Sequence, residues 1–189
     1  MKRNILFMIA GISLALFLNS CGGAGDPKKS KAYLELKTEL DKLKAGDSTE
    51  AANVAAYKKM NDDFMAGKKD DFLNGIADNY LDHNPDTVMS KKPGKEAAAE
   101  MFAIITGAFT EMSMTYSHIM ASGDMVFSHA TMSGKNSGAM GPDMPATGKS
   151  YKDVEFYEVV RYENGKYAER WGLMDINTMM AQMGMMGQK

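Results

Sequence analysis

The chain has 189 residues, of which 44% are hydrophobic and 24% are charged, and this size predicts one globular domain. Its 22 basic and 24 acidic side chains give a formal net charge of −2, which argues against a nucleic-acid-binding protein, since such a protein needs a basic face. The single cysteine excludes an internal disulfide framework and a cysteine-cluster zinc site.

Residues 1–20 predict an export signal. Lys2 and Arg3 precede an apolar run from Ile5 to Leu18, which is shorter than the roughly 20 residues that a membrane-spanning helix needs. The sequence Leu-Asn-Ser before Cys21 makes the segment similar to a bacterial lipoprotein signal. This resemblance implies that Cys21 is acylated and anchors the protein to a membrane of the bacterial cell envelope, facing the periplasm or the cell surface. The alternative is a plain secreted protein with a buried cysteine.

Residues 21–48 predict a connection between this anchor and a folded domain. Their first part is rich in Gly and Lys, which is typical of a flexible tether. Residues Tyr33–Lys44 then predict a spacer helix that ends at Gly46. The domain itself is expected to span residues 49–189.

Three helices are predicted at the start of the domain. Asp47 stands three residues before Glu50, a capping-box spacing that predicts the first helix start. A second, short helix follows, and a third begins after Pro93-Gly94. The apolar residues that carry these helical patterns are Val54, Tyr57, Met60 and Phe64, then Phe72, Ile76 and Tyr80, then Ala98, Met101, Phe102, Ile105 and Phe109.

From Met112 onward the hydrophobic period changes to two, which predicts β-strands. The four predicted strands are Met114–Met120, Met125–Met132, Tyr151–Tyr162 and Tyr167–Trp171. Asn164-Gly165 between the last two is typical of a two-residue hairpin. Helices followed by such a meander predict an α+β fold, with the helices packed on one face of a curved antiparallel sheet and a ligand pocket in the hollow beneath it.

The alternation leaves open which face of the sheet points toward that hollow, because both faces carry apolar and ionisable residues. On the last strand, the residues that are expected to share one face are Tyr167, Glu169 and Trp171. The strand before it has one set of alternating residues on each face: Glu155, Tyr157, Val159 and Arg161 on one, and Phe156, Glu158, Val160 and Tyr162 on the other. On the strand that begins at Met125, His129 shares a face with Met125, Phe127 and Thr131. The glutamates Glu155, Glu158 and Glu169 are expected to be solvated or paired with Arg161 and Arg170.

A series of short motifs resembles the SnoaL-like polyketide cyclase family in order and spacing, from about residue 53 to 184. The motifs are Tyr80-Leu81-Asp82-His83-Asn84-Pro85, Gly94-Lys95-Glu96-Ala97, Gly123-Asp124-Met125-Val126, Ala130-Thr131-Met132-Ser133-Gly134, Met144-Pro145-Ala146-Thr147-Gly148-Lys149, and the closing run Arg161, Asn164-Gly165-Lys166, Glu169-Arg170-Trp171 and Asp175. The sequence departs from the family at Arg170, where His is frequent, and at His129, where a longer basic residue is common.

The resemblance implies a nuclear transport factor 2-like fold with three helices on a curved sheet, and a ring-closing aldol reaction that uses no metal or organic cofactor. Asp175 would be the general acid/base, and burial beside Trp171 would raise the pKa of its carboxyl group. His83 would hold the substrate oxygen. The residues expected to contact a ligand are Trp171, His129, Tyr80, Phe102 and Glu169. A homodimer through the outer face of the sheet is also implied.

These residues also have structural alternatives. Asp175 could cap a final helix at Asn177–Met183, and the turn-forming residues around His83 could end a helix. His129 has no Cys or Asp partner at metal-ligand spacing, so a core or surface role is favoured over metal binding. Trp171 is expected chiefly as a core or pocket-wall residue.

Six methionines crowd the C-terminal segment: Met174, Met179, Met180, Met183, Met185 and Met186. Thioethers suit Cu(I), so a copper-binding envelope protein is one alternative function. The scatter of the chain's 19 methionines favours a role as adaptable core filler instead. The leading expectation is a membrane-tethered domain that binds a small hydrophobic molecule without turnover, followed by a cyclase- or isomerase-type enzyme that uses Asp175.

Overall fold

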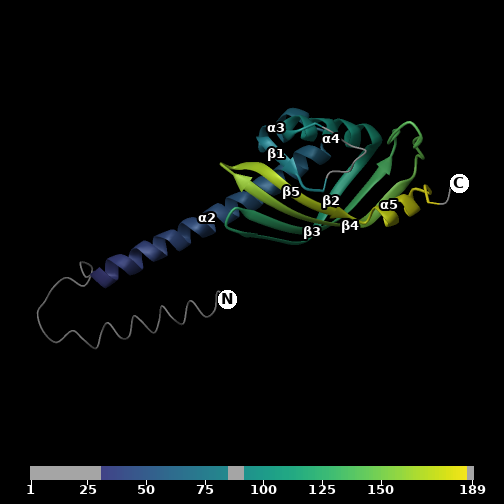
Figure 1. Ribbon diagram of the computed structural model, residues 1–189. Coiled ribbons are helices and arrows are strands. Elements are labelled where there is room, and N and C mark those ends of the chain that lie inside the picture. Colours follow the sequence, from purple (N-terminus) through teal and green to yellow (C-terminus); the bar gives the residue numbers. More distant parts are fainter. Residues whose placement is uncertain (1–30, 85–91, 187–189) are drawn as a thin grey trace, which may run out of the picture. The chain divides into compact units, whose positions relative to one another are not determined.

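The computed structural model describes residues 31–84 and 92–186. The chain divides into two compact units, residues 1–44 and 45–189, and each is described by itself. The predicted export signal and Cys21 lie outside the described residues. Helices and strands carry the labels of Figure 1.

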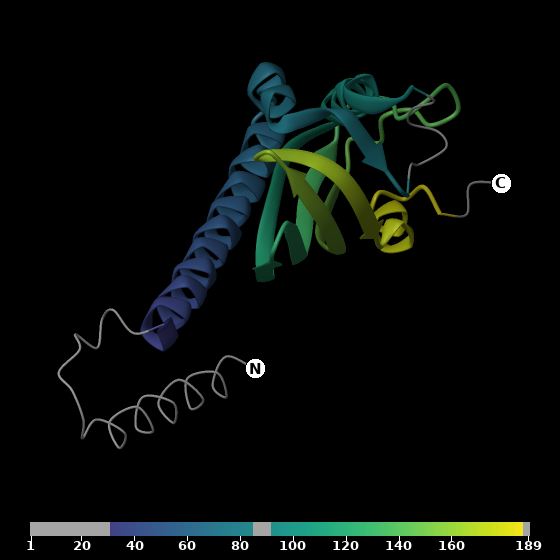
Figure 2. The same ribbon diagram turned by 60° about the vertical axis from the view of Figure 1, so that its left-hand side comes forward.

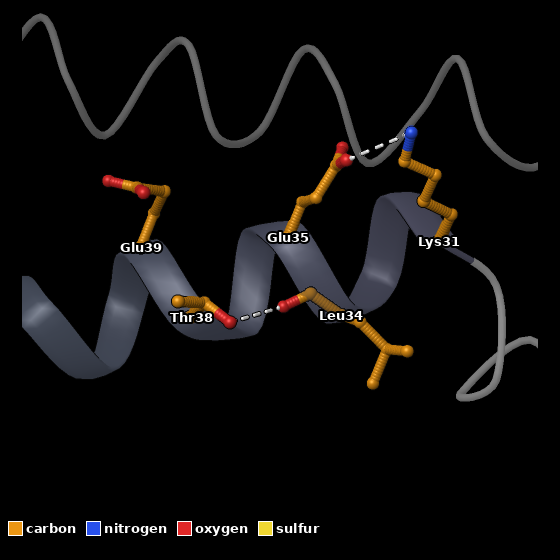
Figure 3. A pocket seen from close by; sticks show the side chains of 5 residues that line it. All are labelled: Lys31, Leu34, Glu35, Thr38 and Glu39. Atoms are coloured by element: carbon orange, nitrogen blue, oxygen red, sulfur yellow. Dashed lines mark hydrogen bonds and ion pairs between the residues drawn. The ribbon is translucent and has the colours of Figure 1, made fainter.

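The described part of the first unit is the beginning of helix α2 (Lys31–Met65). Five exposed side chains line an open surface there: Lys31, Leu34, Glu35, Thr38 and Glu39 (Figure 3). Lys31 pairs with Glu35 at 3.8 Å, and the hydroxyl of Thr38 donates to the carbonyl oxygen of Leu34 at 2.8 Å. These contacts are local to the helix, and the surface offers no enclosed site. Within residues 31–84 and 92–186, no helix is both long enough and apolar enough to cross a membrane.

Helix α2 runs without a break through Gly46 and Asp47, so the predicted helix end and new helix start at these residues are wrong. Glu50, which was expected to complete a capping box, instead accepts a hydrogen bond from the backbone N–H of Gly123 at 3.0 Å. A single glycine costs a helix only about 1 kcal/mol, which the packing of its later turns outweighs.

The second unit contains the rest of α2 and the elements that follow it. In chain order these are α3 (Lys69–Gly75), β1 (Ile76–Asp82), α4 (Gly94–Ala108), β2 (Phe109–Ser122), β3 (Met125–Asn136), β4 (Ser150–Glu163), β5 (Lys166–Met174) and α5 (Ile176–Gln182). Helix α4 and strands β2 to β5 confirm the predicted elements, and each strand is longer than its predicted segment.

The strands form one sheet in the order β1-β5-β4-β3-β2. Strands β2 to β5 make an antiparallel meander, and β1 pairs in parallel with β5 at one edge. The curved sheet is covered on one face by α3, α4 and the end of α2 (Figures 1 and 2). The fold is therefore α+β, as predicted, with a mixed sheet in place of a wholly antiparallel one.

The predicted helix around Phe72, Ile76 and Tyr80 is wrong in its second half. Phe72 lies in α3, whereas Ile76 and Tyr80 lie in β1. A spacing of four residues fits one helical turn, but it also places residues on the same face of a strand, where side chains alternate with period two. Pairing with β5, where Ile76 lies opposite Tyr167, decides in favour of the strand. All three side chains are buried in the same core.

The predicted hairpin between β4 and β5 is confirmed. Asn164 and Gly165 have φ angles of 51° and 73°, and Glu163 lies opposite Lys166. Positive φ at both central residues is typical of the turn whose twist matches that of paired strands.

The methionines of the C-terminal segment mostly pack into a hydrophobic cluster. Met179 and Met183 are buried beside Phe109, Tyr151 and Val154. Of the other methionines in this segment, Met174, Met180 and Met185 pack against this cluster, whereas Met186 is exposed. This arrangement supports the interpretation of methionine as core filler.

A β-bulge in β5 changes which of its side chains face the helices. Arg161 and Tyr162 of β4 are consecutive, but their partners on β5, Glu169 and Tyr167, are two residues apart. Strand β5 therefore has one extra residue, Ala168, and the alternation of its side chains shifts there. Tyr167 faces the helices and Glu169 does not, so the prediction that they share a face is wrong.

Candidate functional site

A cavity of about 490 Å³ lies between the helices and the inner face of the sheet. All five strands, the end of α2, and helices α3, α4 and α5 contribute to its wall. Most of the wall is apolar, with side chains that include Met60, Phe64, Met101, Ile105, Met114 and Met132. Such a volume is in the usual range for small-molecule sites.

One part of the cavity wall is charged, because Arg170 lies between two carboxylates. Its Nε donates to Oε1 of Glu158 at 2.6 Å, and its Nη1 donates to Oδ2 of Asp82 at 2.9 Å. All three residues line the cavity, and Glu158 is only 4% exposed. Burial alone would lower the pKa of Arg170, but Glu158 and the other nearby groups raise it well above its usual value. The guanidinium therefore stays charged within the Asp82–Arg170–Glu158 group.

Two tyrosines complete the hydrogen bonds of Glu158. The hydroxyl of Tyr57 donates to Oε2 at 2.7 Å, and the hydroxyl of Tyr167 donates to Oε1 at 3.0 Å. Burial, and after it the charge of Glu158, raises the pKa of both phenols well above the ordinary value. Both tyrosines therefore remain protonated donors, and Glu158 accepts three hydrogen bonds.

The guanidinium of Arg170 occupies the space that a side chain at residue 172 would fill. A Cβ atom at residue 172 would lie 2.2 Å from Nη2 and 2.5 Å from Cζ of Arg170. Only glycine leaves room for the guanidinium in this position. Since Gly172 lines the cavity, Nη2 lies at the cavity wall.

The end of β1 is held in place by backbone hydrogen bonds. The N–H of His83 donates to the carbonyl oxygen of Arg170 at 2.8 Å, which continues the pairing with β5. The N–H of Asn84 donates to Oδ1 of Asp82 at 3.0 Å, forming a local turn. Asn84 also lines the cavity. These bonds fix the carboxylate of Asp82 toward Arg170.

Of the residues predicted to contact a ligand, Tyr80 lines the cavity. Phe102 is buried in the core, where its ring stacks on Phe72 with 5.4 Å between ring centroids, and it is not part of the cavity wall.

Three other predicted site residues lie on the outer face of the sheet: Glu169 and Trp171 of β5, and His83, which directly follows β1. The ring of His83 stacks on Trp171, with 4.2 Å between centroids and 4° between planes. Its Nε2 is 2.7 Å from Oε2 of Glu169, whose Oε1 accepts a hydrogen bond from Nε of Arg161 at 2.6 Å. The hydrogen bond with His83 has the larger effect and that with Arg161 the next, and both lower the pKa of Glu169. His83, Trp171, Glu169 and Arg161 thus contact one another on the outer face, and none of them lines the cavity.

His129 also lies on the outer face. Its Nε2 is 2.6 Å from Oε2 of Glu155, and its ring stacks on Tyr157 at 4.4 Å. Glu155 therefore pairs with a histidine and not with an arginine. The other two glutamates pair with the two arginines, as one of the two expectations had it: Glu169 with Arg161, and Glu158 with Arg170.

Asp175 caps helix α5, as its structural alternative predicted. Its Oδ1 accepts a hydrogen bond from the N–H of Thr178 at 3.0 Å, and its Oδ2 accepts one from the hydroxyl of Thr178 at 2.6 Å. The side chain is exposed and does not line the cavity. Thr178 lowers the pKa of this carboxyl group, opposite to the rise expected from burial beside Trp171.

Glu158 and Arg170 were not among the predicted site residues. A signal was present in β4, because its even-numbered positions are the more apolar: Val154, Phe156, Val160 and Tyr162. Glu158 belongs to this set, so a carboxylate on the buried face could have been predicted. The bulge at Ala168, which strict alternation does not reveal, brings Arg170 onto the same face as Glu158.

Within the described parts of the chain, no group of three or more His, Cys, Asp or Glu side chains is placed to hold a metal ion. The polar side chains of the cavity wall are those of Arg170 and Lys92, two carboxylates, two phenols and two amides. Such groups bind and orient ligands by hydrogen bonds, and they can transfer protons.

A family model described as SnoaL-like polyketide cyclase matches residues 54–183. IdmH from Streptomyces antibioticus, a candidate polyketide cyclase, is 23% identical, with a TM-score of 0.59 over 70% of this chain and 98% of that one. A candidate SnoaL-like polyketide cyclase from Jannaschia is 18% identical, with a TM-score of 0.60 over 71% and 92% of the two chains. An LEH-like epoxide hydrolase from Mycobacterium tuberculosis is 12% identical, with a TM-score of 0.56 over 71% and 91%. No curated protein sequence matches this chain.

Proposed function

Because the chain belongs to the SnoaL-like polyketide cyclase family, we propose that its cavity binds a small, mainly apolar molecule that carries an oxygen atom. The observation that carries this proposal is an apolar cavity of about 490 Å³ with the Asp82–Arg170–Glu158 group in its wall. An apolar ligand gains free energy by leaving water, and a few polar groups in such a wall set its orientation.

Arg170 is the group best placed to hold the oxygen of such a ligand. Its Nε and Nη1 serve Glu158 and Asp82, whereas Nη2 lies over Gly172 at the cavity wall. A guanidinium has five N–H donors, so donors remain for a ligand. Two carboxylates already offset its charge, and a neutral carbonyl or hydroxyl oxygen therefore fits better than an anion.

Binding can be tested with Nile red, a neutral apolar dye whose fluorescence rises in an apolar site. We expect saturable binding to the full chain. Ala97 of α4 lines the cavity, so Ala97→Phe should fill part of it and weaken Nile red binding at least about tenfold. The matched control is Ala55→Phe, because Ala55 is exposed on α2 and does not line the cavity.

The binding proposal fails if Nile red shows no saturable binding to the wild-type chain. It also fails if Ala97→Phe and Ala55→Phe bind the dye equally well. Circular dichroism of both variants confirms that each is folded before affinities are compared.

The same cavity supports a second candidate function, which is cofactor-free proton transfer. A carboxylate beside an apolar cavity can take a proton from the carbon next to a ligand carbonyl, and a guanidinium can stabilise the negative oxygen that results. Asp82 suits this role better than Glu158, since Glu158 already accepts three hydrogen bonds. The acid/base role expected of Asp175 thus moves to a carboxylate that lines the cavity.

Proton transfer can be tested with a bicyclic ketone such as tetralone in deuterium oxide. Nuclear magnetic resonance measures exchange of the hydrogens next to its carbonyl group. We expect the wild-type chain to accelerate exchange and Asp82→Asn to abolish the acceleration. Asp78→Asn is the matched control, because Asp78 lies on the same strand with its side chain 96% exposed. Equal rates with wild-type chain and buffer would rule out this function and leave binding to be judged by Nile red.

A further inference from the structure

Two histidines on the outer face of the sheet point their nitrogens at each other. His118 of β2 and His129 of β3 have their Nδ1 atoms 3.4 Å apart. The ring centroids are 5.7 Å apart, and the planes differ by 9°. The centroids are thus farther apart than the nitrogens by about two ring radii, so the rings meet edge to edge and do not stack face to face.

A β-bulge creates this pair. Tyr116 lies opposite Ala130, but His118 lies opposite His129, so Ser117 is an extra residue on β2. If the regular register of Tyr116 and Ala130 continued without a bulge, residue 118 would lie opposite residue 128 and point to the inner face. Bulges commonly re-aim a side chain at functional sites.

Two neighbours fix the orientation of His129. Its Nε2 is 2.6 Å from the carboxylate of Glu155, which accepts the ring N–H and leaves the lone pair of Nδ1 directed at His118. Tyr157 lies flat against the ring at 4.4 Å and 8°. A carboxylate on the far nitrogen is the arrangement that orients histidines bound to metal ions.

We propose that His118 and His129 bind a divalent transition-metal ion through their Nδ1 atoms, with water in the remaining positions. Two metal–nitrogen bonds of about 2.0–2.1 Å at a tetrahedral angle place their nitrogens about 3.4 Å apart, which is the separation found here. The two nitrogens now face each other along one line, so metal binding requires the exposed His118 ring to turn until its Nδ1 lies to one side of the His129 lone pair, with the ion between them. Imidazole nitrogens favour Cu²⁺ over Zn²⁺, and both over Mg²⁺.

The proposal can be tested by titrating the untagged full chain with Cu²⁺ and Zn²⁺ in competition with a coloured chelator. We expect one ion per chain, tighter binding of Cu²⁺ than of Zn²⁺, and no binding of Mg²⁺. His118→Asn and His129→Asn should each weaken Cu²⁺ binding at least about tenfold, and Glu155→Gln should weaken it about 10- to 100-fold. The titration uses Cu²⁺ because methionine thioethers prefer Cu(I), so that binding to the methionines does not contribute to the signal.

The matched control is His83→Asn. His83 also has a carboxylate partner, Glu169 at 2.7 Å, but its ring faces Trp171 and not a second imidazole. Unchanged Cu²⁺ affinity in His83→Asn supports the proposal, whereas a loss as large as that of His118→Asn overturns it. Electron paramagnetic resonance of the wild-type chain gives a readout that needs no variant: coupling to two nitrogens is expected, and one or none overturns the proposal.

Discussion

The guanidinium of Arg170 depends on a residue that has no side chain. It is tied to two carboxylates, so it cannot swing away from a Cβ at residue 172 without breaking buried hydrogen bonds. We expect Gly172→Ala to lower the free energy of unfolding by about 1–3 kcal/mol, measured by urea denaturation, and to weaken Nile red binding.

The control for this prediction is Gly107→Ala in α4, because no atom lies within 4 Å of the Cβ it would add. This variant should not lower the free energy of unfolding, since alanine favours a helix over glycine. If Gly172→Ala keeps both wild-type stability and wild-type dye affinity, the guanidinium is free to move and does not need a glycine at residue 172.

Asp175 is predicted to act on stability through its cap on α5. Thr178 lowers the pKa of this carboxyl group below the ordinary value of 3.8. The cap therefore stabilises the protein fully at pH values above 3.8, where the carboxyl group is ionised in both the folded and the unfolded chain. This stabilisation is lost as the pH falls through the lower pKa of the folded chain. Asp175→Ala should lower the melting temperature at neutral pH, and the difference from wild type should shrink as the pH falls below 3.8.

Thermal denaturation from about pH 7 to about pH 2 measures this effect. Asp175→Asn serves as the control, because an asparagine oxygen still caps the helix and does not titrate. Its melting temperature should exceed that of Asp175→Ala at every pH. A wild-type advantage over Asp175→Ala that does not change with pH would contradict the assigned hydrogen bonds.

At the scale of elements, the sequence predicted the strands and turns that depend on neighbouring residues. Alternating side chains and the Asn164-Gly165 turn locate β4 and β5, because turn type and strand period depend on neighbouring residues. Strand β1 was missed because its buried residues, Ile76 and Tyr80, have a spacing that fits a helix equally well. Its partner β5 is about ninety residues away, and only that pairing selects the strand.

The candidate site was harder to predict than the fold, because it depends on two bulges. The extra residue Ala168 turns Arg170 inward, toward Glu158 and Asp82. The extra residue Ser117 turns His118 outward. A bulge inserts one residue into an otherwise regular alternation, and the pattern of polar and apolar residues alone does not mark which residue that is. Strict alternation therefore placed Tyr167 with Glu169 and Arg170 on the opposite face from Tyr167, whereas Tyr167 and Arg170 both line the cavity.

At the scale of the molecule, the outer face of the sheet exposes large apolar side chains. Leu173 is 70% exposed and Met120 is 57% exposed. Exposed apolar surface favours association, and the family resemblance implies a homodimer through this face. We expect light scattering to give twice the chain mass, and Leu173→Glu to reduce it to the mass of one chain. Leu43→Glu, which changes an exposed residue of α2, should remain dimeric. A monomeric wild-type chain would contradict this prediction.

Membrane attachment is expected to depend on Cys21 alone. Removal of residues 1–20 takes away Lys2 and Arg3, which leaves 20 basic and 24 acidic side chains and a net charge of −4. Such a chain gains nothing electrostatically from anionic lipid, so acyl chains must supply the affinity. In a bacterial host fed labelled palmitate, the wild-type chain should carry label and sediment with membranes. Cys21→Ser should lose the label and stay in the supernatant, whereas the neighbouring Ser20→Ala should behave as wild type. Sedimentation of Cys21→Ser with membranes would show that the protein is held there by something other than a lipid on residue 21.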